Sequence, residues 1–414
     1  MLKIDKVLLA LGMGAFFFDD EEAIKRGAVQ DGFIYPGKPL TPGYTAIRMP
    51  AEQVLVMFVL SDGQVAYGDC IQQQHSGRAG RDALRPSAEI METIRTHYVP
   101  RLEGRELTSF RSLAAEIDAV RVNGERPHVG IPYGLTQALL DALAKSQRKT
   151  MAEVLAGEYH TEVADQPVPL APQAADDWYL NSDKMILKRA PVMPNPLCRT
   201  RKQFEELPEF ITWLKDRIAR LAGADYQPTF FFDFYGSVGF FLDGDMSKIV
   251  GYLARLEETS RPYNLIVEDP IIVNTTKKDQ LQAVQGMRAA LQRAGLRMKL
   301  VADEWVTSFD DIKMYAEAGA MDIYGTHPMD LGGLNNFVEA SIFCHEHGVE
   351  TWLGGTCAGT ERSSQMRCHI ALATRASFML PGPGMGVDEA ISIAINEMQR
   401  TLALIQYRKA REPA

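Results

Sequence analysis

Three stretches of the sequence decide its fold: TFFFDFYG at residues 229–236, NLIVEDP at 264–270 and KLVADEW at 299–305. Each is a short apolar run, typical of a buried strand, and each finishes in an acidic residue: Asp233, Glu268 and Asp303. Glu268 follows Asp233 by 35 residues and Asp303 follows Glu268 by 35, about one strand–helix unit of a β/α barrel. Because neighbouring barrel strands end side by side, the three carboxylates are predicted to converge.

Three carboxylates that share a small volume need a positive charge between them, since their mutual repulsion and loss of water are otherwise unfavourable. Ligand sets made only of oxygen favour a hard cation such as Mg²⁺, with Mn²⁺ possible, over zinc. The sequence therefore predicts a divalent metal site at Asp233, Glu268 and Asp303.

The rest of the second half repeats the same alternation of strand and helix. From about residue 166, eight strand-like runs are separated by amphipathic helical stretches: VPLAP, KMILK, TFFFDFYG, NLIVEDP, KLVADEW, MDIYGTHP, ETWLGGTC and ASFMLPGPG. No Gly-rich phosphate loop follows any of these runs, which argues against an open doubly wound sheet. We predict a TIM-type (β/α)8 barrel over residues 161–414, ending in a long helix at VDEAISIAINEMQRTLALIQYRK.

The first half has a different organisation. A hairpin is predicted at residues 53–69, where two β-rich runs flank an Asp-Gly turn, and VLLALGM near the start reads as a further strand. Helical patterns follow at about 83–103, 108–122 and 133–156. Strands followed by a run of helices predict an α+β domain over residues 1–160, which we expect to pack closely on the barrel.

Composition excludes several classes of partner. The net charge of −9 and the lack of a basic block argue against nucleic acid, because phosphate backbones need a clustered basic surface. No apolar run reaches the roughly 20 residues that span a membrane. Five widely spaced cysteines argue against a disulfide framework. Together these features predict a cytoplasmic protein that acts on a small molecule.

Longer motifs resemble one family along essentially the whole chain. They are FFFDDEEAIKRGAVQDGF, DGQVAYGDC, QHSGRAGRD, PYGLTQALLDALAK, LVADEW, DLGGLNN, GGTCAGTERS and PGMGVDEA. They are similar to motifs of methylaspartate ammonia-lyase, a member of the enolase superfamily. The resemblance implies an enolase-type barrel with an N-terminal cap and a homodimeric lyase of amino-acid catabolism, such as glutamate degradation. It also implies Mg²⁺ on Asp233, Glu268 and Asp303, and elimination of ammonia from 3-methylaspartate to give mesaconate.

The same resemblance implies four substrate-contacting positions: Gln74, Gln173, Thr356 and Cys357. The two glutamines can present amide oxygen or nitrogen to an ammonium or a carboxylate. Thr356 and the backbone N–H of Cys357 follow two glycines at a strand end, where they could bind an anion closely. The proton to be removed lies next to a carboxylate, so a cation on that carboxylate would stabilise the developing charge.

The resemblance breaks at the two bases of the family, a histidine after the second strand and a lysine at the end of the sixth. Asn195 occupies the place of the histidine. Counting back from Asp330 puts His327 at the place of the lysine and Gly325 at that of a glutamine; matching the prolines puts Thr326 at the lysine position instead. No alignment recovers the lysine.

Two residues are therefore candidate catalytic bases. His327 suits proton transfer near neutral pH, because an ordinary imidazole has a pKa of about 6.5. Lys188, predicted at the end of the second strand, is the other candidate. The changed bases also leave open a second reaction on the same fold, dehydration or epimerisation of a hydroxy acid.

Overall fold

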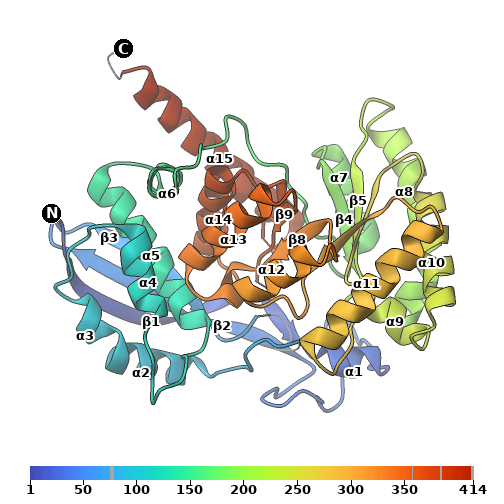
Figure 1. The fold of residues 1–414 in the computed structure, drawn as a ribbon, viewed down its shortest axis with the longest axis horizontal. Helices are drawn as coiled ribbons and strands as arrows, with labels where there is room; N and C mark the ends of the chain where they lie inside the picture. Colours follow the sequence, from blue (N-terminus) through green and yellow to red (C-terminus); the bar gives the residue numbers. More distant parts are fainter. Residues whose placement is uncertain (75–78, 357, 383–384, 412–414) are drawn as a thin grey trace.

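The computed structural model of the chain describes residues 1–74, 79–356, 358–382 and 385–411 (Figure 1). Two groups of elements follow one another along the sequence, which we call the cap and the barrel. The cap contains β1 (Ile4–Asp19), α1 (Glu21–Lys25), β2 (Arg48–Leu60), β3 (Val65–Ile71), α2 (Ser87–His97), α3 (Val99–Leu102), α4 (Phe110–Asp118), α5 (Gly130–Gln147) and α6 (Met151–Tyr159).

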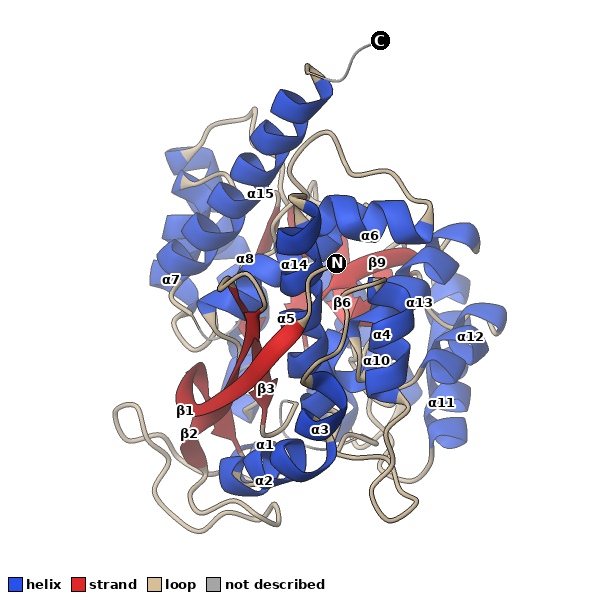
Figure 2. Cartoon of the chain, turned by 90° about the vertical axis from the view of Figure 1, so that its left-hand side faces the viewer, coloured by secondary structure: helices blue, strands red, loops and turns tan. Residues whose placement is uncertain are grey.

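The cap is an antiparallel sheet in the order β1-β2-β3, covered by helices (Figure 2). The predicted hairpin is present, with Val54 opposite Cys70 and Val59 opposite Val65. Helix α5 packs against β2 and β3. The helical pattern at 133–156 forms two helices rather than one, because Arg148 adopts a left-handed conformation with φ of 53° that ends α5. A capping box at Thr150 then starts α6.

The barrel is a parallel sheet in the order β10-β9-β8-β7-β6-β5-β4. Its strands are β4 (Val192–Leu197), β5 (Thr229–Asp233), β6 (Leu265–Glu268), β7 (Lys299–Ala302), β8 (Ile323–Thr326), β9 (Glu350–Leu353) and β10 (Phe378–Met379). Residues 169–171 close it between the edges: Leu170 bridges Met379 of β10, and its carbonyl accepts the Val192 N–H of β4 at 3.4 Å. This segment takes the place of a first strand, so eight chain segments surround the interior.

Helices surround these strands, and most follow a strand as a β/α barrel requires. They are α7 (Trp178–Leu187), α8 (Arg201–Leu221), α9 (Ser237–Phe241), α10 (Met246–Ser260), α11 (Lys277–Arg293), α12 (Phe309–Glu317), η1 (Pro328–Leu331), α13 (Leu334–Glu346), α14 (Glu361–Thr374) and α15 (Val387–Lys409). Helix α15 coincides with the predicted C-terminal helix. None of the helices in the described ranges combines the length and apolar character that crossing a bilayer requires.

The interior of the barrel is a single apolar layer. Each segment contributes side chains to it: Ala171, Val192, Phe231, Ile266, Val301, Ile323, Trp352, Phe378 and Leu380. Alternate residues of a strand face opposite sides, so Phe231 and Asp233 share the inward face of β5. This apolar layer therefore lies directly beneath the strand-end acids, inside the barrel.

The second predicted strand, KMILK, is wrong. Residues 184–187 belong to α7, and the second strand is VMPNPL, the six residues of β4. Two prolines made that stretch look unlike a strand. All six residues of β4 are nevertheless buried, and the Met193–Pro194 peptide bond is cis.

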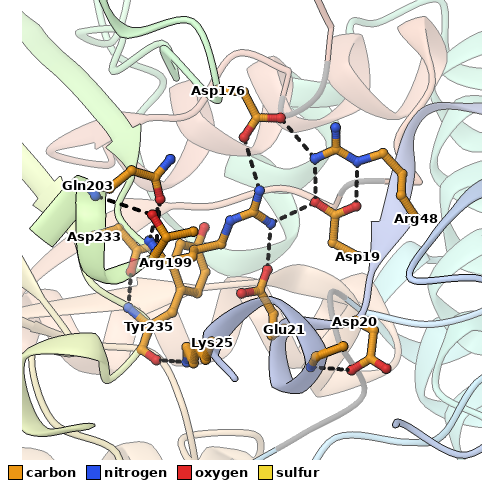
Figure 3. Close-up of polar contacts among 12 residues, drawn as sticks. Asp19, Asp20, Glu21, Lys25, Arg48, Asp176, Arg199, Gln203, Asp233 and Tyr235 are labelled. Carbon is orange, nitrogen blue, oxygen red and sulfur yellow. Dashed lines mark hydrogen bonds and ion pairs between the residues drawn. The ribbon is translucent and has the colours of Figure 1, made fainter. Parts of the chain in front are cut away.

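A buried ion-pair cluster joins the cap to the barrel (Figure 3). Arg199, just after β4, binds Asp19 at 2.7 Å, Glu21 at 2.8 Å and Asp176 at 3.0 Å. Arg48 of β2 binds the same Asp19 at 2.7 Å and Asp176 at 2.8 Å. Burial raises the pKa of Asp19, but the charges of Arg199 and Arg48 outweigh it, and the pKa ends below its usual range.

Replacing Asp19 with asparagine should lower the free energy of unfolding at pH 7 by about 3–5 kcal/mol, the cost of breaking a buried ion pair. Because the folded-state pKa of Asp19 is depressed, its contribution is present above the unfolded pKa of about 3.9 and is lost as the pH falls through the folded pKa. Urea unfolding of both proteins at pH 7 and at acid pH measures this. A stability difference that does not narrow toward acid pH would contradict the assignment.

Candidate active site

Acidic side chains gather where the barrel strands end. Asp233 ends β5 and lies opposite Glu268, the last residue of β6, while Asp303 directly follows β7. All three are buried. Oxygens of Glu268, Asp269 and Asp303 lie within 4.8 Å of one another. Asp233 is outside that tight group but faces the same charges: burial, then Glu304 and Asp303, raise its pKa well above the ordinary value.

This arrangement fits a divalent cation. Both carboxylate oxygens of Glu268 are buried without a hydrogen-bond partner among the described residues. Burial and then Asp233 raise its pKa well above the usual value. Asp233 accepts the Tyr235 N–H on Oδ1 at 3.1 Å and also accepts a hydrogen bond from the Tyr235 side chain. Orphaned carboxylate oxygens in an all-oxygen set are what Mg²⁺ would use as ligands.

Asp269 and Glu304 are site residues that the sequence analysis missed. Asp269 accepts the backbone N–H groups of Asp303 and Glu304 at 3.1 and 2.7 Å, so it fixes the end of β7 against that of β6. Burial and then Glu304 raise its pKa well above the usual value. The sequence feature that could have indicated them is that two of the three strand-end acids are followed directly by a second acidic residue, in Glu268-Asp269 and Asp303-Glu304.

His327 lies beside this cluster, just after β8. Its Nδ1 is 2.7 Å from Asp303 Oδ1. Burial opposes ionisation of Asp303, but Arg81 and then His327 depress its pKa below the usual range, so the carboxylate accepts. In the neutral ring, Nδ1 therefore carries the hydrogen and Nε2 keeps a lone pair. A Cβ at Gly354 would lie 2.5 Å from Nε2, so only glycine lets the chain just after β9 approach the ring this closely.

The cap completes the mouth of the barrel. Gln74 donates from Nε2 to the Gly355 carbonyl at 3.3 Å, and its Oε1 is buried without a partner in the described part of the chain. Thr356, three residues after the end of β9, is buried. These two predicted substrate residues therefore lie at one strand end. Cys357 and the side chain of Thr326 lie outside the described residues.

Asn195 lies within β4, and Gln173 follows the 169–171 segment by two residues. The Asn195 backbone is left-handed, with φ of 45°, and its carbonyl accepts the N–H of Ala174, the neighbour of Gln173, at 3.1 Å. Both amide atoms of Asn195 are buried and lack partners within the described ranges. Since β4 and β8 are four strands apart in the sheet order, Asn195 and His327 stand on opposite sides of the barrel.

Lys188 does not reach this site. It ends α7 as the C-cap residue, its side chain is 37% exposed, and Nζ pairs with Asp388 of α15 at 2.6 Å. Its predicted place at the end of a strand was wrong, because the run that contains it is helical. The structure gives it the role of a surface ion pair between two helices.

Comparison with known proteins identifies the family. Family models for the N-terminus and the C-terminus of methylaspartate ammonia-lyase match residues 2–160 and 162–407. Methylaspartate ammonia-lyase 2 of Carboxydothermus hydrogenoformans is 46% identical over 98% of this chain and 99% of its own. The chain belongs to the methylaspartate ammonia-lyase family. This is a family of carbon–nitrogen lyases, so the predicted enzyme class is confirmed.

Solved structures of this ammonia-lyase family agree with the fold. The β-methylaspartase of Clostridium tetanomorphum in its Mg complex is 41% identical and matches with a TM-score of 0.88 over 98% of this chain and all of its own. The Citrobacter amalonaticus enzyme containing (2S,3S)-3-methylaspartic acid is 39% identical, with a TM-score of 0.91 over 98% of this chain and all of its own. Muconate lactonizing enzyme of Pseudomonas fluorescens, at 15% identity and a TM-score of 0.62, shares the fold alone. The predicted enolase-type barrel is confirmed, and the predicted magnesium site is supported by the Mg complex of the Clostridium relative together with the acidic cluster of this chain.

Proposed function

We propose that this lyase eliminates ammonia from 3-methylaspartate to give mesaconate. The observation that carries the proposal is the meeting of the strand-end acids with His327 through Asp303, inside a chain related over its full length to methylaspartate ammonia-lyases. One site then contains both a cation-binding set of carboxylates and a general base. These are the two things that removal of a proton next to a carboxylate requires.

Asp233, Glu268 and Asp303 would hold Mg²⁺, with Mn²⁺ as a substitute, and the ion would supply Lewis-acid stabilisation of the charge on the substrate carboxylate. The Nε2 atom of His327 accepts the proton from the carbon next to that carboxylate. The electron pair of the broken C–H bond forms the carbon–carbon double bond. The C–N bond breaks, and the amine leaves with its bonding pair.

The remaining site residues bind and orient the substrate in this proposal. The amide oxygen of Gln74 suits an ammonium group, and Thr356 lies at the same strand end, next to the Gly355 that Gln74 binds. Gln173 and Cys357 fill the same role by resemblance. Asn195 offers one donor and one acceptor on the side opposite His327, and it cannot remove a proton because an amide has no basic lone pair.

The proposal also covers the compartment, the oligomeric state and the pathway of the enzyme. We place it in the cytoplasm as a homodimer that acts in amino-acid catabolism such as glutamate degradation, with a cap domain over residues 1–160 and a barrel domain over 161–414. It binds a small carboxylate substrate and neither nucleic acid nor membrane. Gel filtration with light scattering tests the dimer, which a monomeric mass would contradict.

Ultraviolet absorbance of mesaconate formed from 3-methylaspartate tests the reaction. Absorbance should grow with Mg²⁺ present and stop when EDTA removes it, while ammonia appears in equal amount. One observation favours a second candidate function: both family bases have changed, to Asn195 and His327. If no aspartate analogue releases ammonia, the proposal fails, and loss of water or epimerisation with hydroxy acids should be assayed instead.

The enzyme should process one C3 epimer of 3-methylaspartate, with the other slower by about 10²-fold or more, the usual worth of a general base. The reason is that His327 faces the substrate from one side and Asn195 from the other. Ammonia release from each pure (2S) epimer measures the ratio. Introducing Asn195→His should raise the rate of the slow epimer in particular. Equal rates for both epimers in the wild type would contradict this one-sided arrangement.

A further inference from the structure

Arg81 of the cap reaches into the barrel and binds three carboxylates at once. Its Nη2 is 2.7 Å from Asp303 Oδ1, its Nε is 3.0 Å from Asp330 Oδ2, and its Nη1 is 3.4 Å from Glu304 Oε1. The side chain is 1% exposed. These acids follow two different strands, since Asp303 and Glu304 come after β7 and Asp330 lies in η1 after β8. A guanidinium can hold them together because its donors point in fixed, diverging directions.

The contacts of Arg81 divide the acids into two groups. Asp303, Glu304 and Asp330 have a permanent cation among them. Glu268 has no hydrogen-bond partner on either oxygen within the described residues, and Asp233 accepts hydrogen bonds from the uncharged Tyr235. The guanidinium thus neutralises the β7–β8 side and leaves the β5–β6 side for a second positive charge.

Asp303 belongs to both groups, and its two oxygens are used differently. Oδ1 accepts hydrogen bonds from both Arg81 and His327, each at 2.7 Å. With Oδ1 held from two directions, the carboxylate plane is fixed, and Oδ2 is the oxygen available to a cation shared with Glu268. Partners that orient a ligand in this way contribute to metal affinity although they do not touch the metal.

We infer that Arg81 is a positioning residue of the metal site, which fixes Asp303 so that Oδ2 joins Glu268 and Asp233 in binding Mg²⁺. This inference rests on the proposed assignment of those three acids as ligands. It also makes the metal site depend on the docking of the cap. Two residues before Arg81, the Ala79 carbonyl accepts the Trp305 N–H at 3.1 Å, so the same cap segment is attached to the barrel just after β7.

The substitution Arg81→Lys separates position from charge. Lysine keeps the positive charge, so any Coulomb effect on a second cation stays the same. Its ammonium group lacks the planar, fixed donors of a guanidinium, so it cannot hold three carboxylates in place. The matched control is Arg85→Lys, four residues later, where the arginine is 60% exposed and pairs with Glu89 at 3.7 Å on the surface. Mg²⁺ binding to each purified protein is measured by titration calorimetry without substrate.

The dissociation constant for Mg²⁺ should rise about 10-fold or more in Arg81→Lys, the range seen when a partner of a metal ligand is lost, and stay unchanged in Arg85→Lys. The Mg²⁺ concentration for half-maximal activity should rise in parallel, while kcat at saturating Mg²⁺ stays within a few-fold of the wild type. Unchanged Mg²⁺ affinity in Arg81→Lys overturns the inference. So does a fall in kcat at saturating Mg²⁺ with normal affinity.

Two other results have a different meaning from a failure of the inference about Arg81. If the wild type itself binds no Mg²⁺, the proposed metal site fails before Arg81 is tested. If Arg81→Lys does not fold by circular dichroism, Asp330→Asn tests the same contacts from the other end, because Asp330 holds the Nε of Arg81. That variant should also weaken Mg²⁺ binding, and an unchanged dissociation constant in a folded Asp330→Asn protein would overturn the inference.

Discussion

Replacing His327 with alanine should lower kcat for ammonia release by about 10²-fold or more, the usual contribution of a general base. Nδ1 of this ring is committed to Asp303, so Nε2 is the atom that can accept the substrate proton. Steady-state kinetics at saturating Mg²⁺ and substrate measures the loss. KM should change less than kcat, because the ring takes part in the chemical step more than in holding the substrate.

The matched control for this prediction is Lys188→Ala. Lys188 pairs with Asp388 between two helices on the surface, so its removal should leave kcat close to that of the wild type. The opposite pattern, full activity in His327→Ala together with an inactive Lys188→Ala, would transfer the role of base to Lys188.

Replacing Glu268 with glutamine should abolish Mg²⁺ binding and with it the activity, while the metal-free protein becomes no less stable. The pKa of Glu268 is raised by burial and then by Asp233, so its folded-state value lies above the unfolded value of about 4.3. Such a group stabilises nothing when ionised, and its ionisation costs stability as the pH rises above the unfolded pKa. Removing the charge therefore relieves repulsion.

Thermal unfolding with and without Mg²⁺ measures both parts of this prediction. The wild type should gain stability as Mg²⁺ is added, because a ligand that binds only the folded state raises Tm. Glu268→Gln should show no such gain, with a metal-free Tm equal to or above that of the wild type. A normal Mg²⁺-dependent shift in the variant would remove Glu268 from the ligand set.

The strand-end acids could be predicted from the sequence because each follows a run of apolar residues that only a buried strand explains. Asp233, Glu268 and Asp303 all end up where that pattern placed them. The second strand could not be predicted in the same way. Val192–Leu197 contains two prolines, whereas the neighbouring residues 184–188 look more strand-like and are helical up to 187. Tertiary burial on all sides overrides local preference there.

The contacts between the cap and the barrel could not be predicted from the sequence, for a different reason. Arg81 and Asp303 are 222 residues apart, and no local pattern encodes which buried charges meet over such a separation. A polar, glycine-containing segment around Arg81 indicates a loop but not which of its residues enters the barrel. Gln74 was placed through family resemblance, and Asp269 was overlooked because it adjoins a residue already assigned.

The ion pairs between the two halves limit how the gene could be cut. A fragment starting at residue 161 would keep Arg199 and Asp176 but lose Asp19, Glu21 and Arg48, leaving a guanidinium without two of its three carboxylates. It would also lose Arg81 from Asp303. The isolated barrel would thus expose a cluster of unbalanced charge at its catalytic end. An exchange of caps between relatives should give a folded protein only when the new cap carries the charged residues that pair with those of the barrel.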